Sequence, residues 1–205
     1  MATDPPPVTP AQRRAGHGIL AVVLVGILGI AGGVVASLPR GPAKPAMSVV
    51  GGPFRLQSSK GGILDSATLA GKPFLVFFGF TRCPNVCPTT LADLTNLIDD
   101  LHKAGGDIGA YYITLDPERD DVAVLRDYMG SFSDSITGLT GTRAEIDRVA
   151  RSYRVFSKKV PLPGGDYTLE HTLMVYLMDR DGGFVGPLDL AAGHGLALRQ
   201  IQALL

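Results

Sequence analysis

The sequence predicts an α/β fold in which helices cover a mostly buried sheet. The run FLVFFGF at 74–80 is short, fully apolar and rich in aromatic residues, as strands buried on both faces are. Leucine and isoleucine then recur at helical spacing from Leu91 to Leu101. A second apolar run, LMVYLM at 173–178, precedes the turn signal Asp181-Gly182. Short apolar strands alternating with amphipathic helices are typical of this class.

The first strand and helix follow directly from these patterns. Pro88 suits the first turn of a helix, and the apolar repeat continues beyond it, so we expect a helix from about Cys87 to Lys103. Thr142 and Glu145 form a capping-box pattern that opens a later helix. The remaining elements are expected, in order, as a strand at 111–115, helices at 121–129 and 142–153, a strand at 173–178, a return strand from 184 and a closing helix at 196–205.

The N-terminal region predicts a membrane anchor. Residues 18–38 are 21 residues without a charge, and about 20 apolar residues span a bilayer as a helix. A cleaved signal peptide is the alternative, although its apolar region is usually only about 7–15 residues long. We therefore expect a tail at 1–17, a single transmembrane helix at 18–38, a Pro- and Ala-rich linker at 39–51 and one domain at 52–205. The expected location is a bacterial inner membrane, with the domain in the periplasm.

The charge balance argues against nucleic acid as a partner. Lysine and arginine number 19, as do aspartate and glutamate, so the formal net charge is zero. This composition has no basic excess to recruit nucleic acid.

The two cysteines form the most informative motif. Cys83 and Cys87 lie four positions apart, where a buried strand is expected to pass into a helix. The partial positive charge of a helix N-terminus stabilises thiolates, so we expect lowered thiol pKa values. Thiolates suit Cu(I), zinc and iron–sulfur centres, and they are also the nucleophiles of disulfide exchange. A purely structural disulfide is the alternative, but closing so short a loop would add little to the stability of the fold.

Histidines supply further candidate ligands. His171 lies just before the apolar run at 173–178 and is expected to enter from a loop, where binding residues are often placed, but sequence spacing does not bring it to the cysteines. No ligand role is expected for the other three histidines. His17 precedes the expected anchor, His102 is expected to be solvated on a helix, and His194 is expected in a loop or at a helix start.

From about residue 52 onward, the chain resembles the SCO/SenC family of copper proteins linked to cytochrome c oxidase assembly. Several motifs carry the resemblance in the right order. They are Gly71-Lys-Pro73 with FLVFFGFTRCPNVCPTTL, TLDPERD at 114–120, GLTGTR at 138–143, VARSYRV at 149–155 and YTLEHT at 167–172.

The resemblance implies a thioredoxin-like fold with a β-hairpin extension near a copper site. It implies Cys83 and Cys87 as thiolate ligands and His171 as the imidazole ligand, for Cu(I), Cu(II) or both. Asp116 and Asp120 are candidate outer partners, and they have an equally plausible role in satisfying backbone N–H groups. Glu170 is a third candidate, and it stands where the family often has aspartate.

The implied function is that of a metallochaperone for the dinuclear copper centre of cytochrome c oxidase. Its expected partners are the copper-binding subunit of the oxidase and possible further copper chaperones or thiol reductants. The alternatives are a thiol–disulfide oxidoreductase that reduces the cysteines of the oxidase, and a copper or redox sensor. A peroxidase is a weaker option. Beyond the redox-active pair Cys83 and Cys87 no catalytic residue is assigned, and apart from that weaker option the only enzymatic activity considered is the thiol–disulfide exchange of the oxidoreductase alternative.

Overall fold

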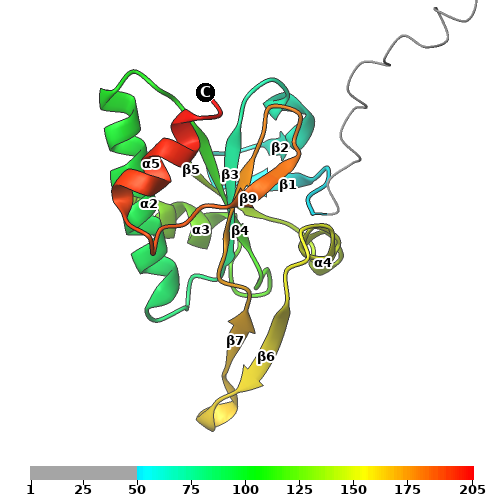
Figure 1. Ribbon diagram of the computed structural model, residues 1–205. Helices are drawn as coiled ribbons and strands as arrows, with labels where there is room; N and C mark the ends of the chain where they lie inside the picture. Colours follow the sequence, from blue (N-terminus) through cyan, green and yellow to red (C-terminus); the bar gives the residue numbers. More distant parts are fainter. Residues whose placement is uncertain (1–49) are drawn as a thin grey trace, which may run out of the picture. The chain divides into compact units, whose positions relative to one another are not determined.

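The computed structural model describes residues 50–205, and Figure 1 shows how their helices and strands are arranged. A seven-stranded sheet in the order β2-β1-β5-β4-β3-β8-β9 forms the centre of the domain. Its strands are β1 (Arg55–Ser58), β2 (Ile63–Asp65), β3 (Phe74–Gly79), β4 (Gly109–Thr114), β5 (Ile136–Thr140), β8 (Val175–Met178) and β9 (Phe184–Pro187). The pairs β3–β4 and β4–β5 are parallel, and the other neighbours are antiparallel.

Helices cover both faces of this sheet, as the α/β class predicts. The helices α2 (Val86–Lys103), α3 (Val122–Met129) and α5 (His194–Gln202) share one core with the sheet, and α4 (Arg143–Ser152) packs on the other face. Two short 3-10 helices, η1 (Ser66–Leu69) and η2 (Pro163–Gly165), complete the helical elements.

The strand β3 is apolar throughout because it is buried on both faces. Leu75 and Phe77 point into the core beneath α2, whereas Val76 and Phe78 point into the core beneath α4. Successive side chains of a strand alternate between faces, so each of the two layers receives its own apolar set.

A separate two-stranded hairpin extends from the central domain. It consists of β6 (Ser157–Pro161) and β7 (Tyr167–His171), in antiparallel register with Ser157 opposite His171. Figure 1 shows this hairpin projecting beyond the sheet, and it corresponds to the extension that the resemblance implies.

The expected elements are confirmed with small shifts of boundary. Thr142 and Glu145 form the predicted capping box of α4, and Asp121 caps α3. The closing helix begins at His194 rather than at Leu196. The expected tail, anchor and linker lie outside the described residues, except for the last two linker positions. No helix at 50–205 has the length and apolar character needed to cross a membrane.

Candidate metal centre

Cys83 and Cys87 lie where β3 passes into α2. The Cys83 N–H donates to the Phe80 carbonyl at 3.1 Å, and the Cys87 N–H donates to the Cys83 sulfur at 3.4 Å. Cys87 is fully buried and Cys83 is partly exposed, and both thiols are free. The start of α2 therefore holds the two sulfurs together, with only Cys83 open to solvent.

His171 reaches the cysteines from the end of the hairpin strand β7, and the expected loop position is wrong because His171 pairs with Ser157 of β6. Its Nε2 lies 3.7 Å from the Cys87 sulfur, and its Nδ1 lies 2.9 Å from the Thr172 carbonyl oxygen. Because a carbonyl only accepts, Nδ1 carries the proton and the Nε2 lone pair faces the sulfur. The Phe80 ring packs edge-on against the imidazole at a centroid distance of 5.8 Å and helps to fix its orientation.

Cys83, Cys87 and His171 lie close enough together to hold one metal ion. Within residues 50–205, no other group of three or more histidine, cysteine or acidic side chains does so. The ligand atoms of these three side chains all lie within 4.8 Å of one another. Atoms about 2.0–2.3 Å from a shared ion have comparable separations, so small adjustments would bring all three onto one ion. Two sulfurs and one imidazole are a soft to borderline donor set that suits copper or zinc.

The protonation of the metal-free site differs from the expectation for a helix N-terminus. Burial, reinforced by the neighbouring Cys83, raises the pKa of the Cys87 thiol to about 12. The expected lowering is therefore wrong for Cys87, because loss of water outweighs the helix dipole. Burial also lowers the pKa of His171, which keeps the imidazole neutral and available as a ligand at pH 7.

Asp120 holds the loop that carries the cysteines. Its buried carboxylate accepts hydrogen bonds from the Thr81 N–H at 2.9 Å, the Thr81 hydroxyl at 2.6 Å and the Thr114 hydroxyl at 2.6 Å. No hydrogen bond joins it to the three clustered side chains. Of the two roles expected for Asp120, it therefore has the structural one, in which it accepts hydrogen bonds from a backbone N–H and neighbouring hydroxyls. It joins the end of β4 to the segment just before Cys83.

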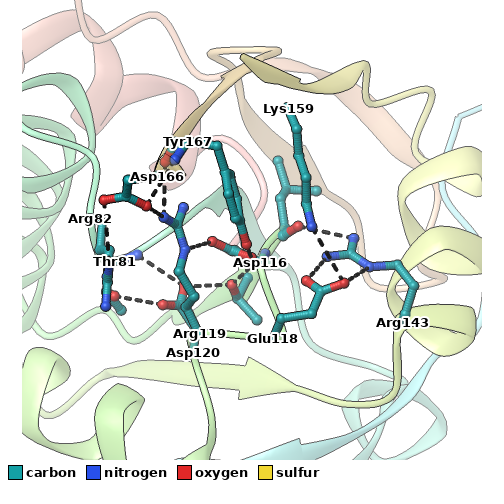
Figure 2. A network of polar contacts seen from close by, with 12 residues as sticks. Thr81, Arg82, Asp116, Glu118, Arg119, Asp120, Arg143, Lys159, Asp166 and Tyr167 are labelled. Carbon is teal, nitrogen blue, oxygen red and sulfur yellow. Dashed lines mark hydrogen bonds and ion pairs between the residues drawn. The ribbon is translucent and has the colours of Figure 1, made fainter. Parts of the chain in front are cut away.

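Asp116 and Arg119 hold the hairpin that carries His171, as Figure 2 shows. The Asp116 carboxylate is buried and accepts from the Tyr167 hydroxyl at 2.7 Å and from Arg119 Nε. Arg119 also donates to the Tyr167 carbonyl at 2.8 Å and to Asp166 at 2.9 Å, and its guanidinium lies 3.7 Å from the centroid of the Tyr167 ring. These contacts clamp the start of β7 to the loop after β4.

Charged side chains around this clamp are more exposed. Arg143 and Lys159 both pair with Glu118, and Arg82 pairs with Asp166 at 3.7 Å. Both members of the Arg82–Asp166 pair are more than half exposed, so that pair contributes little stability.

Gly79 provides space behind the cysteines. A Cβ placed on it would lie 2.8 Å from the Cys87 sulfur and 2.7 Å from the Tyr112 hydroxyl. A glycine within a strand often marks a close approach of other atoms, so the glycine in FLVFFGF could have predicted this contact. Arg119 and Tyr167 were not predicted as functional residues, although they lie within the motifs TLDPERD and YTLEHT.

The remaining candidates lie away from the cluster. Glu170 is exposed, and as the neighbour of His171 on an extended strand it points to the opposite face. His102 pairs with Asp107 at 3.2 Å, and His194 pairs with Asp100 at 3.1 Å. His17 lies outside the described residues.

Comparison with known proteins gives one consistent family. Residues 42–205 match the SCO1/SenC family. The chain is 40% identical over 156 residues to mitochondrial SCO1 of Saccharomyces cerevisiae, covering 75% of this chain and 52% of the yeast protein. It is 38% identical over 140 residues to the human mitochondrial SCO1 homolog, covering 67% of this chain and 46% of the human protein. The chain thus spans about half the length of these curated relatives.

Solved structures agree with the sequence matches. Bradyrhizobium japonicum ScoI with copper bound is 44% identical, with a TM-score of 0.72, and the match covers 76% of this chain and 99% of that one. Yeast Sco1 with copper bound is 37% identical, with a TM-score of 0.69, covering 75% and 87% of the two chains. These matches confirm the mixed α/β, thioredoxin-like fold expected from the sequence.

Proposed function

The chain belongs to the SCO1/SenC family, and on that premise we propose that it carries copper to the copper-binding subunit of cytochrome c oxidase. Copper is the cargo, and Cys83, Cys87 and His171 are its ligands. The observation that carries the proposal is the convergence of these three donors within 4.8 Å, at the junction of two separate elements. Two similar structures are of proteins with copper bound, and they supply independent support.

The donor set suits a carrier that must also release its metal. Two thiolates favour Cu(I), and the imidazole allows Cu(II) to be held with additional ligands. Cys83 is partly exposed whereas Cys87 is buried, so an acceptor can approach the ion from the Cys83 side. A closed cage of buried ligands would not permit that exchange.

Thiol–disulfide exchange is the second candidate. Both cysteines are free and adjacent, and the partly exposed Cys83 is the thiol that could attack a disulfide of the acceptor. The raised pKa of Cys87, about 12, disfavours its thiolate and therefore its role as the second nucleophile. Exchange would not require His171, and the approach of His171 to the sulfurs favours copper binding.

We also propose the location that this function requires. The apolar segment at 18–38 would anchor the chain in a bacterial inner membrane, with the copper-binding domain in the periplasm beside the oxidase. Protease accessibility of the domain in intact spheroplasts tests this arrangement, because a cytoplasmic domain would remain protected.

Transfer of copper decides between the two candidate functions. The purified, reduced chain is loaded with one equivalent of Cu(I) and mixed with the copper-binding domain of the oxidase, whose cysteines are either reduced or joined in a disulfide. We expect copper to move to the reduced acceptor. Reduction of the disulfide form without transfer to the reduced form would contradict the carrier role and support the oxidoreductase.

A further inference from the structure

The Tyr112 hydroxyl lies beside the Cys87 sulfur in the core beneath the cluster. Tyr112 is on β4 and its side chain is completely buried. The position of a Cβ on Gly79 would be 2.7 Å from this hydroxyl and 2.8 Å from the sulfur, so both atoms border the same small space. Within the described part of the chain, the hydroxyl has no hydrogen-bond partner.

A buried hydroxyl without a partner is costly, and its retention needs an explanation. The ring is held firmly, with centroid distances of 5.8 Å to Phe77 and 6.0 Å to Tyr128. A neutral thiol is a weak acceptor, whereas a thiolate is a strong one. A metal-bound Cys87 thiolate would therefore supply the acceptor that the Tyr112 hydroxyl lacks.

We propose that Tyr112 is a positioning residue of the metal centre, whose hydroxyl donates a hydrogen bond to the Cys87 sulfur when that sulfur binds a metal as a thiolate. The inference rests on the proposed metal site. A hydrogen bond to a metal-bound sulfur withdraws electron density from it, and contacts of this kind tune the metal. Tyr112 thus adjusts how strongly Cys87 donates to copper.

Tyr176 provides a matched control. Its hydroxyl is also buried without a hydrogen-bond partner among residues 50–205, but its ring packs against Phe78 and Tyr153 in the core on the other face of the sheet. Tyr112→Phe and Tyr176→Phe each remove a buried hydroxyl without a partner from an aromatic cluster. Only the first change removes a donor beside Cys87.

The test compares the full-length chain with these two variants, each loaded with Cu(II) and, separately, with Co(II). We expect Tyr112→Phe to move the sulfur-to-metal charge-transfer bands to longer wavelength, because the sulfur becomes a better donor. The bands of Tyr176→Phe should match those of the wild type. Metal-free thermal unfolding should show that both variants are folded and at least as stable as the wild type.

The outcomes separate this inference from the proposed function. A wild-type chain that binds neither Cu(I) nor Cu(II) contradicts the proposed function, and the Co(II) bands then test the role of Tyr112. Unchanged bands in Tyr112→Phe, equal shifts in both variants or loss of metal by Tyr112→Phe would overturn the inference. A wild-type chain that binds neither metal would overturn both.

Discussion

Cys87 Sγ and His171 Nε2 lie 3.7 Å apart although the two residues are 84 positions apart along the chain. The cysteine belongs to the first turn of α2, and the histidine ends the hairpin strand β7. Neither element could place both donors alone. The site therefore depends on the contacts that hold the hairpin against the loops after β3 and β4, and the following predictions test those contacts.

Replacing His171 with alanine should weaken Cu(II) binding by at least about 100-fold, because the loss of a ligand should exceed the effect of an outer-shell partner. The sulfur-to-copper charge-transfer band should also change. Competition titration and absorption spectroscopy measure the two effects. His194→Ala is the control, since His194 pairs with Asp100 at 3.1 Å and is not one of the clustered donors. Equal binding by both variants would remove His171 from the site.

Gly79→Ala should displace the Cys87 sulfur and the Tyr112 hydroxyl, both less than 3 Å from the new methyl group. We expect a loss of about 1–3 kcal/mol in the free energy of unfolding, as for overpacked cores, together with weaker copper binding. Gly186→Ala is the matched control on β9, because no atom lies within 4 Å of the corresponding position. Denaturant unfolding and copper titration give the two readouts, and a Gly79→Ala protein of wild-type stability would contradict the crowding argument.

The sequence predicted those elements whose pattern is local. The apolar β3, the amphipathic α2 and the capped α4 each have the periodicity or capping residues of their class. Three strands of the sheet were not predicted: β1 and β2 are short and only partly buried, and the buried β5 has the sequence ITGLT, with only two strongly apolar side chains. The hairpin was expected only through the resemblance, and local patterns predicted neither β6 nor β7, because β6 is mostly exposed and polar and the two strands pair only with each other.

The site residues likewise divide into those that a local pattern predicted and those that depend on contacts between distant segments. Cys83 and Cys87 were predicted from their own chemistry, because four positions suffice to bring them together at a helix start. His171 entered through resemblance alone, since its approach depends on the hairpin. The contacts among Asp116, Arg119 and Tyr167 were not predicted, because no local sequence pattern indicates that β7 packs against the loop after β4.

Arg119→Gln should loosen the hairpin, because Arg119 joins Asp116, Asp166 and the Tyr167 carbonyl and is only 11% exposed. We expect about 10-fold weaker copper binding, within the range for outer-shell changes, and faster amide exchange in β6 and β7. Arg82→Gln removes an exposed partner of the same Asp166 and should have little effect. If both variants exchange at the wild-type rate, the clamp does not order the hairpin.

Copper binding should strengthen as pH rises. With a pKa of about 12, metal-free Cys87 is protonated throughout the range from about pH 7 to 9, and it must lose that proton to bind as a thiolate. The apparent affinity should therefore increase by at least about tenfold per pH unit in this range. His171 has a lowered pKa and is neutral there, so it adds no proton competition. Proton release on copper addition, measured with an indicator dye, should be at least one per ion, and an affinity independent of pH would contradict a Cys87 ligand.

Asp120→Ala should reduce both stability and copper binding, because it leaves the Thr81 N–H and two threonine hydroxyls without their buried acceptor. Each unsatisfied group costs about 1–3 kcal/mol before relaxation, so we expect a total loss of roughly 2–5 kcal/mol. Asp121→Ala is the neighbouring control: Asp121 caps α3 by accepting from the Val124 N–H, and its loss should cost about 1 kcal/mol. Because that cap lies outside the cysteine loop, Asp121→Ala should bind copper normally at temperatures where it is folded. Wild-type copper affinity in a folded Asp120→Ala protein would show that the Thr81–Asp120 link does not position the cysteines.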